Sequence, residues 1–137
     1  MTLIKSISGI RGTIGGKPDQ GLTPLDTVKF ASAYGMWVLN NNKEAKQCTV
    51  VIGRDARISG QMVSSIVSGT LIGIGIHVID LGLSTTPTVE MAVTELNAQG
   101  GIILTASHNP KQWNALKLLN EKGEFISEKD RFICQSE

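Results

Sequence analysis

The stretch GGIILTASHNP, residues 100–110, decides the fold that this sequence predicts. Its aliphatic run at residues 102–104 is typical of a strand that is buried on both faces of an α/β sheet. Small and polar residues follow the strand, and the Asn109-Pro110 pair predicts a turn immediately after them. Because ligands in such sheets bind beyond the carboxyl ends of the strands, we expect the functional site in the loop after residue 104.

Strand and helix patterns alternate on both sides of this stretch. A strand interrupted by glycines is expected within residues 3–14, and helices are expected to start at Thr23-Pro24, Ser59 and Thr86-Pro87. The other strands are expected at residues 49–53, 76–80, 102–104 and 113–120. The order β-α-β-α-β-α-β-β predicts an α/β fold, a three-layer α/β/α domain with a mostly parallel mixed sheet.

Length, charge and cysteine content limit the class of protein. The chain has 137 residues and a formal net charge of +1, so we expect one domain, residues 1–137, and no nucleic-acid partner. The apolar runs are too short to predict a membrane span. Cys48 and Cys134 lack metal-ligand spacing, and the N-terminus lacks the apolar segment of a signal peptide. These features predict a cytoplasmic protein.

Ser107 is the candidate nucleophile of the predicted loop. A serine hydroxyl is a weak nucleophile without an activating partner, and no G-x-S-x-G turn surrounds Ser107. In an extended segment the side chain of His108 points away from that of Ser107, which argues against a simple Ser-His couple. A serine in a loop can also do no more than hydrogen-bond the backbone, and this alternative stays open at this point.

Phosphoryl chemistry fits the neighbouring charges better than hydrolysis. A phosphoserine carries about −1.5 to −2 charges, which cations must neutralise. Arg11, His108 and Lys117 are suitable cations, and the predicted topology brings all three near one edge of the sheet. Asp55 lies between two arginines on a second loop, and we expect this arrangement to be an ion-pair lattice that holds the loop.

Three motifs carry a resemblance to a known family. They are TASHNP at residues 105–110, GIRG at residues 9–12 and the GRDxRxSG pattern at residues 53–60. With these motifs the chain resembles the first domain of the α-D-phosphohexomutases, the superfamily of phosphoglucomutase, phosphomannomutase and phosphoglucosamine mutase. The family often has Tyr-Asn-Gly where this chain has WNA at residues 113–115.

The resemblance implies a role for each matching residue. Ser107 would be carried as a phosphoserine, acting as phosphoryl donor and acceptor and offering a phosphoryl oxygen to a bound Mg²⁺. Arg11 and Lys117 would be candidates for proton transfer at the sugar hydroxyl, and His108 would lie near the phosphoryl group. The residues implied to line or support the active loop are Asn109, Arg54, Asp55 and Arg57.

The resemblance also implies a longer enzyme. The family's aspartate-rich magnesium loop has no counterpart in this sequence, so we expect a piece of a multidomain enzyme whose downstream domains complete the metal site. That enzyme would interconvert hexose 1-phosphate and hexose 6-phosphate through a hexose bisphosphate. The sequence does not identify the hexose. The alternative is a stand-alone module that binds a sugar phosphate or another anion without catalysis.

Overall fold

The computed structural model describes residues 2–6, 9–106 and 109–126. In these residues a six-stranded sheet has the strand order β1-β2-β6-β5-β3-β4. None of the helices among them has the length and apolar character that a membrane crossing requires. The elements are β1 (Ile4–Ser6), β2 (Gly9–Thr13), α1 (Pro24–Asn40), β3 (Thr49–Arg54), α2 (Gly60–Gly73), β4 (His77–Leu83), α3 (Thr86–Glu95), β5 (Gly100–Leu104) and β6 (Trp113–Leu119).

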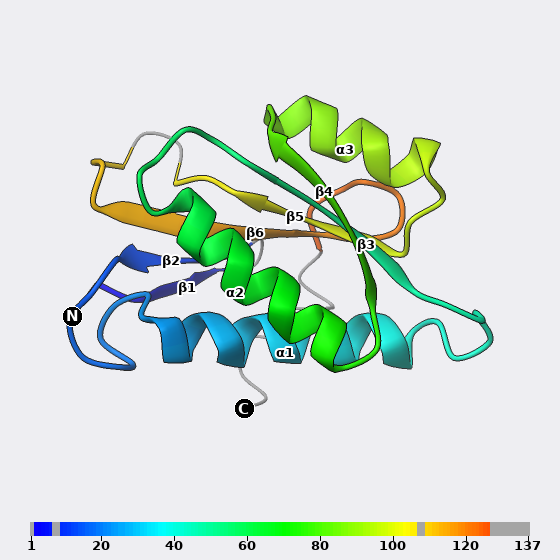
Figure 1. Ribbon diagram of the computed structural model, residues 1–137, viewed down its shortest axis with the longest axis horizontal. Coiled ribbons are helices and arrows are strands. Elements are labelled where there is room, and N and C mark those ends of the chain that lie inside the picture. The colour runs from blue at the N-terminus through cyan, green and yellow to red at the C-terminus, as the bar shows by residue number, and fades with distance from the viewer. Residues whose placement is uncertain (1, 7–8, 107–108, 127–137) are drawn as a thin grey trace.

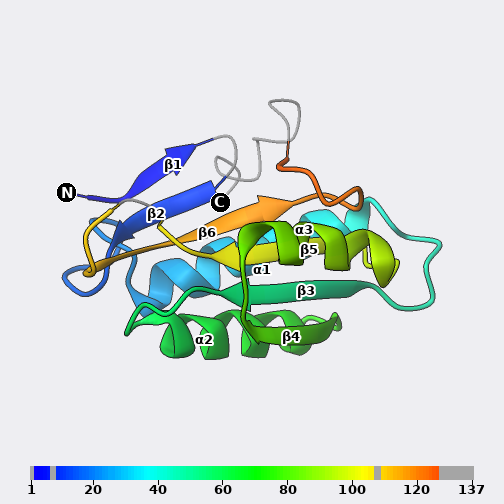
Figure 2. The same ribbon diagram turned by 90° about the horizontal axis from the view of Figure 1, so that it is seen from above.

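The helices cover both faces of the sheet. Helices α1 and α2 lie on one face and α3 lies on the other, as Figures 1 and 2 show. Ile102 and Leu104 of β5 pack into the larger core with α1 and α2, and Ile103 packs into a smaller core with α3. This alternation is expected of a strand that is buried on both faces. The predicted three-layer α/β/α architecture is confirmed.

The sheet is mixed, as predicted, but its parallel part is smaller than expected. Strands β3, β4 and β5 run parallel, whereas β1, β2 and β6 form antiparallel pairs. Two of the five pairings are therefore parallel. The reason is the short connection from β5 to β6, since a parallel neighbour needs a crossover of about a dozen residues or more, usually a helix.

The interrupted N-terminal strand is two strands. β1 pairs with β2 in antiparallel register, with Ser6 opposite Gly9, and residues 7–8 lie outside the described residues. β2 also pairs with β6. A Cβ atom on Gly9 would lie 2.3 Å from the carbonyl oxygen of Leu116, so only glycine permits this close approach of β2 to β6.

The predicted helix starts are right in position and differ in capping. Thr23 caps α1 through a capping box, as its hydroxyl suggested. Ser59 stands at the N-cap of α2 without a capping hydrogen bond, because its Oγ instead accepts from Nδ2 of Asn114 at 2.9 Å. In α3 the cap is Thr85 rather than Thr86.

A buried tyrosine joins α1 to the two strands that carry the loop. The Tyr34 hydroxyl accepts from the Gly101 N–H at 2.9 Å and donates to the Leu119 carbonyl oxygen at 2.5 Å. Burial raises the pKa of Tyr34 well above its usual value. A Cβ atom on Gly100 would lie 2.2 Å from the same hydroxyl oxygen. The glycine pair at the start of β5 therefore makes room for this contact.

Candidate functional site

The candidate loop connects β5 to β6 at the carboxyl end of β5. The neighbouring β3 ends at the same edge of the sheet, where the Asp55 N–H donates to the Leu104 carbonyl oxygen at 3.1 Å. Ser107 and His108, the predicted nucleophile and its neighbour, lie outside the described residues. The residues on either side of them are described, and they define how both ends of the loop are held.

Asp55 holds the amino-terminal end of the loop. Its Oδ2 accepts from the Thr105 hydroxyl at 2.6 Å and from Nε of Arg57 at 3.2 Å. Its Oδ1 accepts from the Arg57 backbone N–H at 3.2 Å. The expected ion pair beside the loop is thus formed by Asp55 and Arg57, while Arg54 makes no side-chain hydrogen bond with the described residues.

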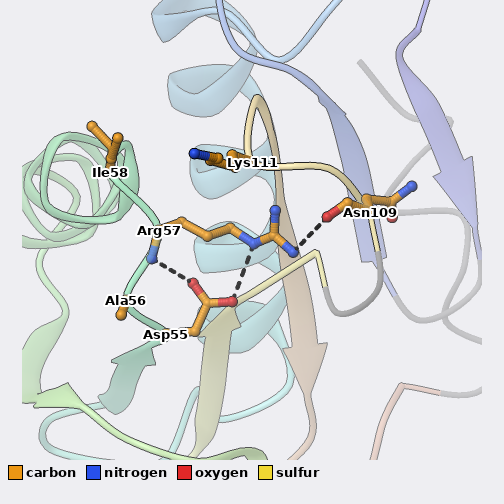
Figure 3. A pocket seen from close by; sticks show the side chains of 6 residues that line it. All are labelled: Asp55, Ala56, Arg57, Ile58, Asn109 and Lys111. Carbon is orange, nitrogen blue, oxygen red and sulfur yellow. Dashed lines mark hydrogen bonds and ion pairs between the residues drawn. The ribbon is translucent and has the colours of Figure 1, made fainter.

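Arg57 holds the carboxyl-terminal end of the loop. Its guanidinium donates to the carbonyl oxygens of Pro110 at 2.7 Å, Asn109 at 3.0 Å and Trp113 at 3.1 Å. Figure 3 shows the guanidinium between the Asp55 carboxylate and the Asn109 carbonyl. We call these bonds, with those of Asp55 to Thr105 and Arg57, the loop clamp. The loop clamp ties both ends of the 105–109 segment to the β3–α2 turn.

A hollow of about 370 Å³ opens beside the loop clamp. Figure 3 shows Arg57 between Asp55 on one side and Ile58 and Lys111 on the other, and all four residues line the hollow. A second hollow of about 580 Å³ adjoins it and shares Ile58 and Lys111. The sequence alone does not indicate a role for Lys111, because a lysine after a turn carries no specific signal. The residues that line the first hollow are Asp55, Ala56, Arg57, Ile58, Asn109 and Lys111.

Arg11 and Lys117 lie on the same face of the sheet. Arg11 of β2 is opposite Ala115 of β6, and Lys117 stands two residues further along β6. Since alternate residues share a face, the two cations are diagonal neighbours with a Cα separation of about 7–8 Å. Lys117 is also opposite Ile103, next to the end of β5, so both cations are near the base of the loop.

The strand that presents Lys117 is regular at the position where the family often has glycine. Ala115 pairs with Arg11 inside β6, and its φ is not positive, so this position does not need glycine. Asn114 beside it is completely buried and bonded to Ser59 and to the Ala115 N–H. Sequence reasoning missed this role of Asn114, because an isolated asparagine in a strand does not reveal a partner 55 residues away.

Metal ligands do not cluster in the described part of the chain. Among residues 2–6, 9–106 and 109–126, no group of three or more histidine, cysteine or acidic side chains lies close enough to hold a metal ion. His77 is an exposed side chain on β4. These residues alone therefore do not fit a Mg²⁺ site.

Comparisons with known proteins agree with this fold. Residues 3–136 match the family described as "Phosphoglucomutase/phosphomannomutase, alpha/beta/alpha domain I". A phosphoglucomutase/phosphomannomutase of Thermococcus kodakarensis is 38% identical over 126 residues, covering 90% of this chain and 27% of the relative. A phosphoglucosamine mutase of Alkaliphilus metalliredigens is 40% identical over 115 residues, covering 84% of this chain and 24% of the relative.

A solved structure has the same fold. The crystal structure of a Thermus thermophilus protein described as a phosphomannomutase superposes with a TM-score of 0.83 at 29% identity, covering 99% of this chain and 30% of that one. The fold and these similarities define an α/β/α domain of the phosphohexomutase type. The chain belongs to the phosphoglucomutase/phosphomannomutase family, as its domain I. It spans about a quarter of the length of the curated relatives it matches.

Proposed function

We propose that this chain is the phosphoserine domain of a longer phosphohexomutase, in which Ser107 passes a phosphoryl group to and from a hexose phosphate. The observation that supports the proposal best is the loop clamp, which holds the 105–109 segment at both ends. Phosphoryl transfer depends chiefly on positioning and electrostatic stabilisation, and a loop held in this way suits that requirement.

The proposed cycle contains two transfers. In the first, the bond from phosphorus to Ser107 Oγ breaks and a bond to a sugar hydroxyl oxygen forms, giving a hexose bisphosphate and a free serine. After the bisphosphate has reoriented in the site, its other phosphoryl group moves to Ser107 Oγ. The net result is the interconversion of hexose 1-phosphate and hexose 6-phosphate.

Arg11 and Lys117 are proposed to serve these transfers from the base of the loop. The attacking hydroxyl must lose a proton, and Lys117 in its neutral amine form is the better acceptor, because an arginine keeps its proton in proteins. Arg11 is exposed and keeps its positive charge, so it is suited to neutralise the phosphoryl oxygens. His108 and Asn109 are proposed to line the same loop.

Magnesium and the choice of sugar are proposed to depend on parts of the enzyme beyond this chain. The described residues do not form a metal site, and we propose that a further domain supplies the Mg²⁺ ligands alongside phosphorylated Ser107. The names of the relatives include glucose, mannose and glucosamine phosphates, and the proposal is therefore limited to hexose phosphates as a class. A cytoplasmic location stays a prediction from the sequence.

The test begins with the native gene product from its source cell. We expect a protein several times the size of this chain, with about 80 Da of phosphoryl mass on the peptide that contains Ser107. Ser107→Ala in that enzyme should reduce mutase turnover by orders of magnitude, whereas Ser65→Ala on the exposed side of α2 should not. Near-normal turnover of Ser107→Ala would contradict the proposal. Micromolar binding of a hexose phosphate by the 137-residue chain alone would instead favour the non-catalytic module.

A further inference from the structure

We infer that Arg57, oriented by Asp55, is a positioning residue that sets the placement of the segment carrying Ser107. The inference rests on the proposed function and adds a role that the resemblance did not supply, because the resemblance implied only general support for the loop. The Arg57 side chain bonds three carbonyl oxygens that follow residues 107–108 in the chain, and its ion-pair partner bonds a hydroxyl that precedes them.

The geometry favours arginine specifically at this position. The guanidinium uses all three of its nitrogens, donating from Nε to Asp55 and from its two terminal nitrogens to the carbonyls of Asn109 and Pro110. A planar fork with fixed donor directions can make these bonds together. A lysine ammonium would keep the charge but could not reproduce the arrangement.

The charges indicate a positioning role rather than phosphate binding. The positive charge of Arg57 is compensated by Asp55, and its side chain is only 11% exposed. The partners described above are a carboxylate and backbone carbonyls, all of which belong to the protein. Arg11 and Lys111 are the more exposed cations near the loop. Arg57 therefore acts on the reaction through the loop and not by contact with the substrate.

The expected consequence is a change in turnover rather than in substrate binding. Loss of the fork releases the carbonyls of Asn109 and Pro110, which immediately follow residues 107–108 in the chain. A shift of about 1 Å in a reacting group can cost on the order of 100-fold in rate. The remaining domains would still bind the sugar, so KM should change little.

The experiment uses the full-length enzyme with four variants. Arg57→Lys and Asp55→Asn should each reduce kcat about 10- to 100-fold, with KM within about threefold of the wild type. The kcat of the double variant should be little lower than that of either single variant, because both substitutions disrupt the same set of bonds. Asp80→Asn is the matched control, since Asp80 also accepts from a backbone N–H two residues on, at Gly82, but lies on β4 away from the loop.

Three results would overturn the inference. Wild-type kcat in Arg57→Lys would mean that only the charge matters. A loss of turnover that merely follows the fraction of unfolded enzyme, measured by thermal denaturation, would mean a general structural role. A rise in KM at constant kcat would mean a role in substrate binding.

A more conservative substitution, Thr105→Val, tests the inference if the Arg57 and Asp55 variants do not fold. Thr105→Val removes the hydroxyl that Asp55 accepts from and nearly preserves shape, and it should lower kcat by about threefold or more. An unchanged kcat in Thr105→Val would count against the inference. Ser107→Ala is assayed in parallel, because an active Ser107→Ala enzyme would defeat the proposed function itself, whatever the Arg57 variants do.

Discussion

The contact of Tyr34 with the start of β5 predicts that Tyr34→Phe and Gly100→Ala are strongly coupled in their effects on the free energy of unfolding. Tyr34→Phe removes the hydroxyl that the Gly101 N–H and the Leu119 carbonyl share in a fully buried site. A buried polar group that loses its partner costs about 1–3 kcal/mol, so we expect a loss of about 2 kcal/mol in the free energy of unfolding. At this chain length that loss lowers Tm by about 6–8 °C.

Gly100→Ala should be costly only while the hydroxyl is present. The new Cβ would lie 2.2 Å from the Tyr34 oxygen, which its two hydrogen bonds hold in place. Overpacking of this kind costs about 1–3 kcal/mol. In the Tyr34→Phe background the nearest ring atom is Cζ at 3.2 Å, so most of that cost should disappear. We therefore expect an interaction free energy of at least about 1 kcal/mol between the two sites.

The assay is urea denaturation of wild type, both single variants and the double variant. Gly69→Ala is the matched control, because no atom lies within 4 Å of its added Cβ and alanine favours the helix by about 0.5–1 kcal/mol. If the effects of Tyr34→Phe and Gly100→Ala add to within about 0.5 kcal/mol, the steric explanation of the glycine pair is refuted.

Two other predictions follow from buried polar groups. Asn114→Ala should lower the free energy of unfolding by about 2–3 kcal/mol, because it leaves the Ala115 N–H and the Ser59 hydroxyl without their partner; the urea midpoint measures this loss, and an unchanged midpoint would contradict it. Since burial raises the pKa of Tyr34, the stabilisation from its neutral form is fully present below about pH 10 and is lost as pH rises toward the folded-state pKa. Tyr34 is the one tyrosine of the chain, so its ultraviolet absorbance reports this ionisation; titration near pH 10 in the folded chain would contradict the prediction.

Local patterns in the sequence predicted most of the elements but not how the strands pair. The aliphatic run at residues 102–104 and the cap at Thr23 depend on neighbours in sequence, and both appear in the structure as expected. The direction of β6 follows from the short connection after β5, which strand periodicity alone does not take into account, and its register depends on distant partners. Thus the sequence alone predicted a larger parallel share than the structure has.

The candidate site shows the same limit. The motif pattern identified Asp55 and Arg57 as residues beside the loop, and their ion pair is present. The bonds from Arg57 to the Asn109 and Pro110 carbonyls were beyond prediction, since every residue has a backbone carbonyl and none is marked in a sequence. The roles of Ser107 and His108 stay predictions, because both residues lie outside the described part of the chain.

The antiparallel pairing of β5 with β6 has a consequence for how such a domain can diverge. Leu104 and Leu116 face each other across neighbouring strands, so the intervening segment begins and ends at a fixed separation whatever its composition. Closing a longer segment is inexpensive, since each doubling of loop length costs only about 0.6 kcal/mol of entropy. Insertions and exchanges there would leave the sheet intact. Selection on reactivity can therefore act on this segment almost independently of selection on folding. The bonds from Arg57 to carbonyls within the segment are the main restriction on its length.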